Sequence, residues 1–361
     1  MKTKFSILVI SAFLAIVCTS TAEAWDLPLN VDVFKIKFDH GGDNSALNIR
    51  VNYSLDVSIP EFSYYAQISR PAFVRNASPS IETMFTAFPP DTGTSLTIGA
   101  TSADSTWSMN TVEVFFNGSG ISIGDTGYVS LSTLSGKTIP STVGIDSVTW
   151  AWKVTKIGGT TQTPPLSVDT RYHGYYVLLD TPQAPMTEPW TAVLDYACSW
   201  ASGATSSSGV VSGVTTGAYN GNFKNYRYSP SHCAPPTLYL SNLLNDTEAD
   251  CGDMAGVVQV FSNAIGLAQY SVQYKKIDSN NNTFTTKQID PIGSDMSWQS
   301  VTWGWHVIGW YNSSVYDACI RLNESSPRVP IGDDLEGSYK NDLYQSGTWN
   351  PLGSSYLTAV Q

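Results

Sequence analysis

The sequence predicts a multi-domain protein, with an N-terminal all-β sandwich followed by a C-terminal α+β domain. Two observations favour this fold class. Short alternating segments continue to about residue 180, and apolar residues with helical spacing first appear at Trp190. The chain has 361 residues, enough for roughly two or three domains, and 42% of them are hydrophobic, which suffices for packed cores.

The first residues have the features of a secretory signal peptide. Lys2 and Lys4 make its start positive, residues 5–17 are apolar except for two serines, and Ala22-Glu23-Ala24 offers small residues around a cleavage site. The apolar stretch is shorter than the roughly 20 residues that a spanning helix needs. We therefore expect an exported protein, secreted or periplasmic, that is cleaved near Ala24 and has no membrane span.

Charge restricts the partners of the chain. It carries 19 basic and 30 acidic side chains, for a formal net charge of −11. Binding to a phosphate backbone requires a cationic face, which this composition does not favour. We therefore expect no nucleic-acid partner, and the composition leaves the oligomeric state open.

The segment from residue 25 to 180 has the alternation of half-buried antiparallel strands. Two such sheets can each bury one face against the other, which predicts a sandwich. His40 and His173 stand alone here and are interpreted as structural. The clearest predicted strands are Asp32–Phe38, Leu47–Tyr53, Thr111–Phe116, Ser147–Val154 and Tyr175–Leu179.

A proline-rich stretch separates the two predicted domains. Residues 181–189 contain three prolines, which end strands and suit an extended connection. The predicted organisation is a signal peptide at 1–24, a β-sandwich domain at 25–180, this linker, and a second domain at 190–361.

The second domain is predicted to begin with a helix. Apolar residues recur every three or four positions from Trp190 to Ala201, and Gly203 follows as a stop signal. Cys198 lies on the apolar face of this helix. We expect its thiol to be buried or bridged.

A second helix is predicted after Asp250. An apolar stripe runs from Met254 to Ile265, Asp250 is a good N-cap, and Gly266 is placed to end the helix. Cys251 therefore lies at the start of a helix. Alternation then returns, which predicts strands at Tyr270–Ile277, Thr285–Ile289, Thr302–Trp310 and Ser314–Leu322, with a turn at Asp278–Thr283.

Cys251, His306 and Asp317 are the candidate catalytic residues. A helix N-terminus favours the thiolate, the reactive form of cysteine. A two-residue turn at Asn312-Ser313 would place His306 opposite Cys319, with Asp317 as its diagonal neighbour on the same face of the hairpin. A thiol, a base and a carboxylate that orients the base are the components of a nucleophilic triad.

Three short blocks in this region resemble a known family. They are Ala249–Ala255, Trp305–Val307 and Val315–Cys319, and they look like the cysteine, histidine and aspartate blocks of the transglutaminase-like superfamily. The fold of that superfamily is distantly related to papain-type peptidases. The helical segment from Pro189 to Ala201 is similar to the one that precedes the nucleophile in bacterial members, and the whole resemblance covers roughly Thr187 to Asn323.

The resemblance implies an enzyme that acts on protein or peptide amides through a thioester. Cys251 would be the nucleophile, His306 the general base and then acid, and Asp317 the group that holds the imidazole. Hydrolysis or deamidation is favoured over crosslinking, and no cofactor or metal is implied. The Cys251 amide would stabilise the oxyanion, with a second donor from Asn242–Asn245 or Trp298–Trp305.

Another interpretation needs no catalysis. Cys198, Cys233, Cys251 and Cys319 could form two structural disulfides in an exported chain. The protein would then be an adhesion or carbohydrate-binding protein with a disulfide-stabilised second domain. If Cys251 is instead the free nucleophile, we favour a bridge between Cys198 and Cys233 that closes the Ser/Gly/Thr-rich residues 202–231, with Cys319 buried beneath the site.

Overall fold

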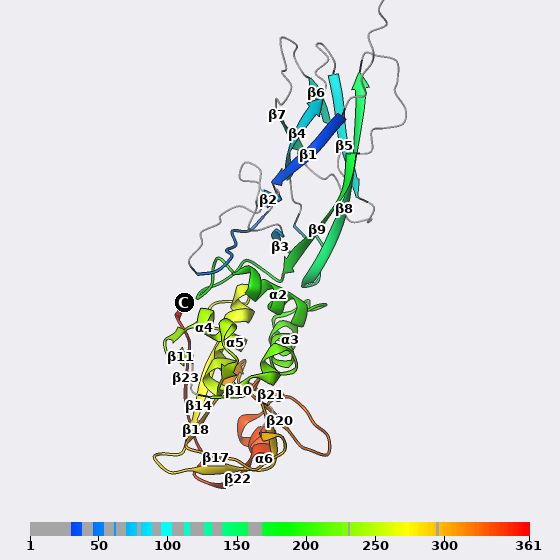
Figure 1. The fold of residues 1–361 in the computed structure, drawn as a ribbon. Coiled ribbons are helices and arrows are strands. Elements are labelled where there is room, and N and C mark those ends of the chain that lie inside the picture. The colour runs from blue at the N-terminus through cyan, green and yellow to red at the C-terminus, as the bar shows by residue number, and fades with distance from the viewer. Residues whose placement is uncertain are drawn as a thin grey trace, which may run out of the picture.

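The structure is a computed structural model, drawn in Figure 1. It describes residues 30–37, 46–53, 61–62, 70–77, 81–88, 95–102, 112–115, 126–131, 139–157, 168–229, 232–293 and 296–361. The predicted signal peptide and His40 lie outside these residues. The protein is mixed, with strands in several sheets and a small number of helices, as an α+β class predicts.

Two sheets form the first half of the described chain, and they occupy the upper part of Figure 1. One has the strand order β2-β1-β4-β7 and the other β3-β9-β8-β5-β6. Most neighbours are antiparallel, whereas β3 and β9 are parallel. The strands are β1 (Asn30–Lys37), β2 (Glu61–Phe62), β3 (Ala72–Val74), β4 (Ile81–Phe88), β5 (Ser95–Ser102), β6 (Val112–Phe115), β7 (Thr126–Leu131), β8 (Gly144–Ile157) and β9 (Val168–Leu178).

Four of the five strands predicted for this half are confirmed, because they overlap β1, β6, β8 and β9. The prediction for Leu47–Tyr53 is wrong. These residues form only isolated bridges, including a parallel one between Arg50 and Trp190. The Arg50 amide donates to the Pro189 carbonyl at 3.0 Å, and the Thr191 amide donates to Arg50 at 2.8 Å. The alternation is real, since Ile49 is buried, but the segment makes only single contacts: the Leu47 amide donates to the Ala72 carbonyl of β3 at 2.9 Å, and Arg50 bridges to Trp190.

Both predicted helices are confirmed, as α2 (Thr191–Trp200) and α5 (Cys251–Ala264). Three further α-helices of the described chain were not predicted: α3 (Ser207–Asn220), α4 (Leu240–Asn245) and the short α6 (Lys340–Leu343). In α3, Gly213 and Gly217 face α2. A Cβ on Gly217 would lie 2.0 Å from Cγ of Trp200, so only glycine permits this contact. The glycines lower the helix propensity of the segment, and tertiary packing compensates for that loss.

The largest sheet of the second half has the order β21-β19-β18-β14-β23, and α5 packs against β14 and β18. Every residue of α5 except Gly252 is buried. The principal strands are β14 (Val272–Asp278), β18 (Trp305–Tyr311), β19 (Ser314–Tyr316), β21 (Ile331–Asp333) and β23 (Asn350–Ser355).

Shorter elements complete this half. The predicted strand Thr302–Trp310 is divided into β17 (Thr302–Trp303) and β18. The predicted strand Ser314–Leu322 is divided into β19 and β20 (Ile320–Leu322), and the break between them contains Asp317. The remaining elements are η1 (Asn222–Asn225), β10 (Arg227–Tyr228), β11 (Cys233–Ala234), β12 (Thr237–Leu238), β13 (Glu248–Ala249), β15 (Phe284–Thr286), β16 (Ile289–Pro291), β17 (Thr302–Trp303), β20 (Ile320–Leu322), the π-helix η3 (Leu335–Tyr339), α6 (Lys340–Leu343), β22 (Tyr344–Gly347) and β24 (Ala359–Val360).

The predicted disulfides are wrong, because no disulfide joins Cys198, Cys233, Cys251 or Cys319 in the described part of the chain. Cys198 is buried in α2, where its thiol donates to the Val177 carbonyl at 3.8 Å. The segment that a Cys198–Cys233 bridge was expected to close is held instead by α3 packing on α2. In the described part of the chain, no helix is long and apolar enough to cross a bilayer.

Candidate functional site

Cys251 is the first residue of α5, directly after the N-cap. The Asp250 carboxylate accepts from the amides of Gly252 at 2.7 Å and Asp253 at 3.0 Å, and the Asp253 carboxylate accepts from the Asp250 amide at 3.0 Å. This reciprocal capping box fixes the first turn of the helix. The sulfur therefore lies at the positive end of the helix dipole, which favours a thiolate.

His306 and Asp317 meet across the predicted hairpin. Residues 309–311 of β18 pair with 316–314 of β19, which is the register expected from a two-residue turn. Asn312 and Ser313 both have positive φ, at 47° and 62°, as a type I′ turn requires. His306 Nε2 lies 2.9 Å from Asp317 Oδ2, and both side chains are buried. The predicted register and the contact between these two residues are confirmed.

Asp317 is held by two further donors. The Tyr339 hydroxyl donates to Oδ2 at 2.7 Å, and the Cys319 amide donates to Oδ1 at 2.9 Å. Tyr339 is fully buried in η3, and its pKa is raised well above the ordinary value, first by burial and then by the charge of Asp317. The phenol therefore stays protonated and remains a donor.

Arg328 anchors the segment that carries Tyr339. Its guanidinium donates to Asp333 at 2.9 and 2.7 Å and to Asp342 at 2.6 Å. Asp333 precedes η3 and Asp342 lies in α6, so the cation binds both ends of the segment. Paired bonds from one guanidinium also restrict its orientation.

The charge of the imidazole follows from its surroundings. Burial lowers the pKa of His306, but the Asp317 carboxylate and the contact with Cys251 outweigh that effect and raise the pKa to about 10. Trp303 stacks on the ring, with centroids 4.5 Å apart and planes 11° from parallel. His306 Nδ1 is buried and makes no hydrogen bond within the described structure. Because Nε2 binds Asp317, Nδ1 is the atom left for Cys251.

Tyr228 is a contact of the thiol that the sequence analysis missed. Its side chain interacts with Cys251: burial is the largest cause of its raised pKa, followed by the nearby Cys251 and Cys319. Tyr228 lies in β10, which pairs in parallel with β13 just before Cys251. The pairing joins only residues 227–228 to residues 248–249, and so short a pairing produces no hydrophobic periodicity in the sequence. No local feature of the sequence therefore pointed to Tyr228.

The other thiols near the site are kept protonated. Burial, and then the charges of Asp317 and Cys251, raise the pKa of Cys319 well above its ordinary value. Burial, together with Asp253 and Asp250, raises the pKa of Cys233 to about 12. Cys319 is buried beside the triad, as predicted.

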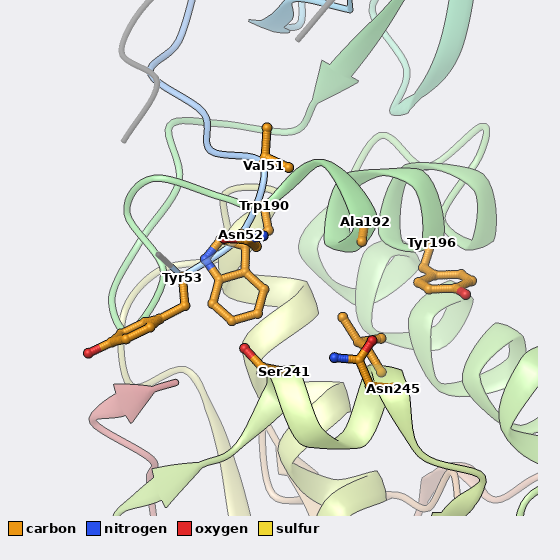
Figure 2. Close-up of a pocket in the computed structure, with 9 residues that line it drawn as sticks. Val51, Asn52, Tyr53, Trp190, Ala192, Tyr196, Ser241 and Asn245 are labelled. Atoms are coloured by element: carbon orange, nitrogen blue, oxygen red, sulfur yellow. The ribbon is translucent and has the colours of Figure 1, made fainter. Parts of the chain in front are cut away.

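The segments expected to supply a second oxyanion donor have other contacts. Trp303 covers His306, and Trp298 lies over the Arg321 guanidinium at 5.8 Å. Asn245 lines a separate cavity of about 520 Å³, shown in Figure 2, which contains none of the three candidate catalytic residues. The side chain that contacts the thiol is therefore Tyr228.

No group of three or more His, Cys, Asp or Glu side chains suited to a metal ion occurs among the described residues. No model of a known protein family matches this sequence, and no similar sequence is found among curated proteins.

Proposed function

We propose that the protein is an exported thiol enzyme that acts on protein or peptide amide bonds. Its two N-terminal sheets would form a sandwich, and residues 190–361 a transglutaminase-like domain. The observation that carries the proposal is the buried Asp317–His306 pair, whose free Nδ1 adjoins Cys251 at the start of α5. A thiol, a base and an orienting carboxylate in this order are what nucleophilic catalysis by cysteine requires.

In the proposed reaction, the Cys251 thiol has already given its proton to His306, so the resting site is a thiolate beside a protonated imidazole. The thiolate attacks the carbonyl carbon of an amide, and the carbonyl electrons move to oxygen. When the tetrahedral intermediate collapses, His306 gives its proton to the leaving nitrogen, so a carboxamide releases ammonia and a peptide releases an amine. Water, deprotonated by His306, then attacks the thioester, yielding a carboxylic acid and the free thiol.

The surroundings of the pair support these roles. A pKa of about 10 keeps His306 protonated near neutral pH, and a thiolate is stabilised by such a partner. The Cys251 amide at the helix start and the Tyr228 hydroxyl beside Cys251 are the donors that we assign to the oxyanion. Asp317, itself held by Tyr339 and the Cys319 amide, keeps the imidazole in place.

Access to the thiol is part of the proposal. Cys251 is 1% exposed and His306 0%, so a substrate reaches the sulfur only when the side chains over it, Tyr228 among them, move aside. Water is a smaller acceptor than a lysine side chain. Restricted access therefore favours hydrolysis or deamidation over crosslinking.

The test is Cys251→Ala, assayed with glutamine- and asparagine-containing peptides for ammonia release and for incorporation of a fluorescent primary amine. We expect activity to disappear, while Cys198→Ala, which changes a buried thiol in α2, retains it. Tyr228→Phe should lower the rate by roughly 10- to 1,000-fold, as removal of an oxyanion donor does. Ammonia release that survives Cys251→Ala would disprove the mechanism.

Alkylation provides a second test that needs no substrate. Iodoacetamide followed by peptide mapping should modify Cys251 first in the native protein. Cys198 and Cys319 should react only after unfolding, because burial keeps both as protonated thiols. A native protein in which Cys251 reacts no faster than Cys198 would contradict the proposal.

A further inference from the structure

The cavity shown in Figure 2 lies between residues 51–53, α2 and α4, and none of the three candidate catalytic residues lines it. Its volume is about 520 Å³, within the range of roughly 300–1,000 Å³ typical of ligand pockets. Tyr196, in its wall, packs against Phe261 with ring centroids 6.4 Å apart. Phe261 follows Cys251 by ten helical residues, which is about 15 Å along α5. The cavity is thus separate from the proposed catalytic site.

Aromatic side chains line this cavity from three segments. Figure 2 shows Trp190 above the hollow, with Tyr53 on one side and Tyr196 on the other. Trp190 is 5% exposed and is therefore a rigid part of the wall. Tyr53 is 54% exposed, the highest value among the exposed large hydrophobic side chains of the described residues. Its ring is available to pack against a ligand.

Two polar side chains of α4 face the same space. Ser241 and Asn245 are one helical turn apart, so they lie on one side of the helix, and Figure 2 shows both beneath Trp190. In the part of the chain that the structure describes, neither side chain makes a hydrogen bond. The hydroxyl and the amide can each donate and accept, which is the requirement for binding another hydroxyl.

The cavity lining is uncharged. It consists of Val51, Asn52, Tyr53, Trp190, Ala192, Tyr196, Ser241, Leu244 and Asn245. A charged ligand would leave water here without an opposite charge to compensate for its desolvation. The whole chain also has a formal net charge of −11, which disfavours anions further.

We propose that this cavity binds a neutral sugar residue, such as one unit of a neutral oligosaccharide. A pyranose ring has an apolar C–H face, which suits the Tyr53 ring, and a rim of hydroxyls that both donate and accept, which suits Ser241 and Asn245. This function does not depend on catalysis at Cys251. It would give the protein a means of attaching to a glycan-bearing surface.

The test is ligand-observed saturation-transfer NMR on the exported protein with maltotriose, cellotriose and N,N′,N″-triacetylchitotriose. Trigalacturonate is the anionic comparison, and the tripeptide Gly-Tyr-Gly is the peptide comparison. We expect saturable binding of at least one neutral trisaccharide, and at least tenfold weaker binding of trigalacturonate. Asn245→Ala and Tyr53→Ala should each weaken binding by about five- to tenfold, the usual effect of losing one good contact.

Two control variants change the same residue types outside the cavity. Asn242→Ala changes an exposed amide on α4 outside the cavity, and Tyr270→Ala changes an exposed tyrosine elsewhere. Both should bind as the parent does, and so should Cys251→Ala, whatever its activity. The proposal is wrong if no neutral trisaccharide binds, if Asn245→Ala and Tyr53→Ala both bind unchanged, or if Gly-Tyr-Gly binds as tightly as the sugars.

Discussion

The contact between His306 and Asp317 predicts how the stability of the protein depends on pH. The folded pKa of His306 is about 10, above its ordinary value of 6.5. A base with a raised pKa stabilises the folded state fully below its unfolded pKa, and that stabilisation is lost as the pH rises through the folded pKa. The free energy of unfolding should therefore fall between these two values.

The size of the effect follows from the same two values. Once His306 has lost its proton in the unfolded chain, the free energy of unfolding falls by about 1.4 kcal/mol for each pH unit. The total fall is about 2 kcal/mol from about pH 6.5 to about pH 8.5. The other shifted groups act mainly outside the range from about pH 6.5 to about pH 8.5. Asp253 has a pKa of about 6, below it, while the thiols with raised pKa values, such as Cys233, begin to lower stability only as the pH approaches the ordinary thiol value of 9.0.

Asp317→Asn should make this fall much smaller, because the Asp317 carboxylate is the largest of the effects that raise the pKa of His306, and burial then opposes the contact with Cys251 that remains. The assay is urea denaturation of parent and variant at half-unit steps of pH. Asp246→Asn is the matched control, since Asp246 lies 3.5 Å from His232 in a pair with side-chain exposures of 16% and 44%. This pair is longer and closer to solvent than the buried His306–Asp317 pair, so it should contribute less. A fall that persists unchanged in Asp317→Asn would refute the reasoning.

Three further outcomes are expected in urea denaturation. Tyr339→Phe removes the buried hydroxyl that donates to Asp317, so it should lower the free energy of unfolding by about 1.5–3 kcal/mol. Tyr344 is half-buried, but its hydroxyl donates to the Gly347 carbonyl in an exposed position, so Tyr344→Phe should change the free energy of unfolding by less than about 0.5 kcal/mol. Equal effects would exclude a special role for Tyr339. Asp250→Ala removes the N-cap of α5 and should cost about 1–2 kcal/mol, and no loss would show that the cap is unimportant. Gly213→Ala places a Cβ 2.7 Å from the Trp200 carbonyl oxygen, so it should lower the free energy of unfolding by about 1–3 kcal/mol. Gly304→Ala is the control, because its Cβ would meet nothing within 4 Å. Equal losses in the two variants would contradict the close packing of α2 and α3.

Local signals predicted much of the site correctly. The helix at Cys251 has an apolar stripe and an N-cap, both of which act within a few residues. The β18–β19 register depends on two turn residues and on strict alternation, so parity alone placed His306 on the face of Asp317. These features are short in range, and a sequence can encode them without knowledge of the rest of the chain.

Other features depend on distant residues. Residues 207–220 have weak helix propensity, and their glycines are favourable only because Trp200 of α2 packs against them. The absence of the Cys198–Cys233 bridge was not predictable, since whether two cysteines pair depends on the distance between the elements that carry them. Tyr228 and Tyr339 approach Cys251 and Asp317 from segments with no shared periodicity.

The sequence by itself thus determined the helix that presents Cys251 and the hairpin that joins His306 to Asp317, because period, capping and turn geometry are local properties of the chain. Only the tertiary structure decided what surrounds them: the tyrosines, the stacked Trp303, and the burial that with Asp317 sets the charge of His306. The reason is physical. Desolvation and packing depend on every segment that covers a group, and those segments meet only in the folded protein.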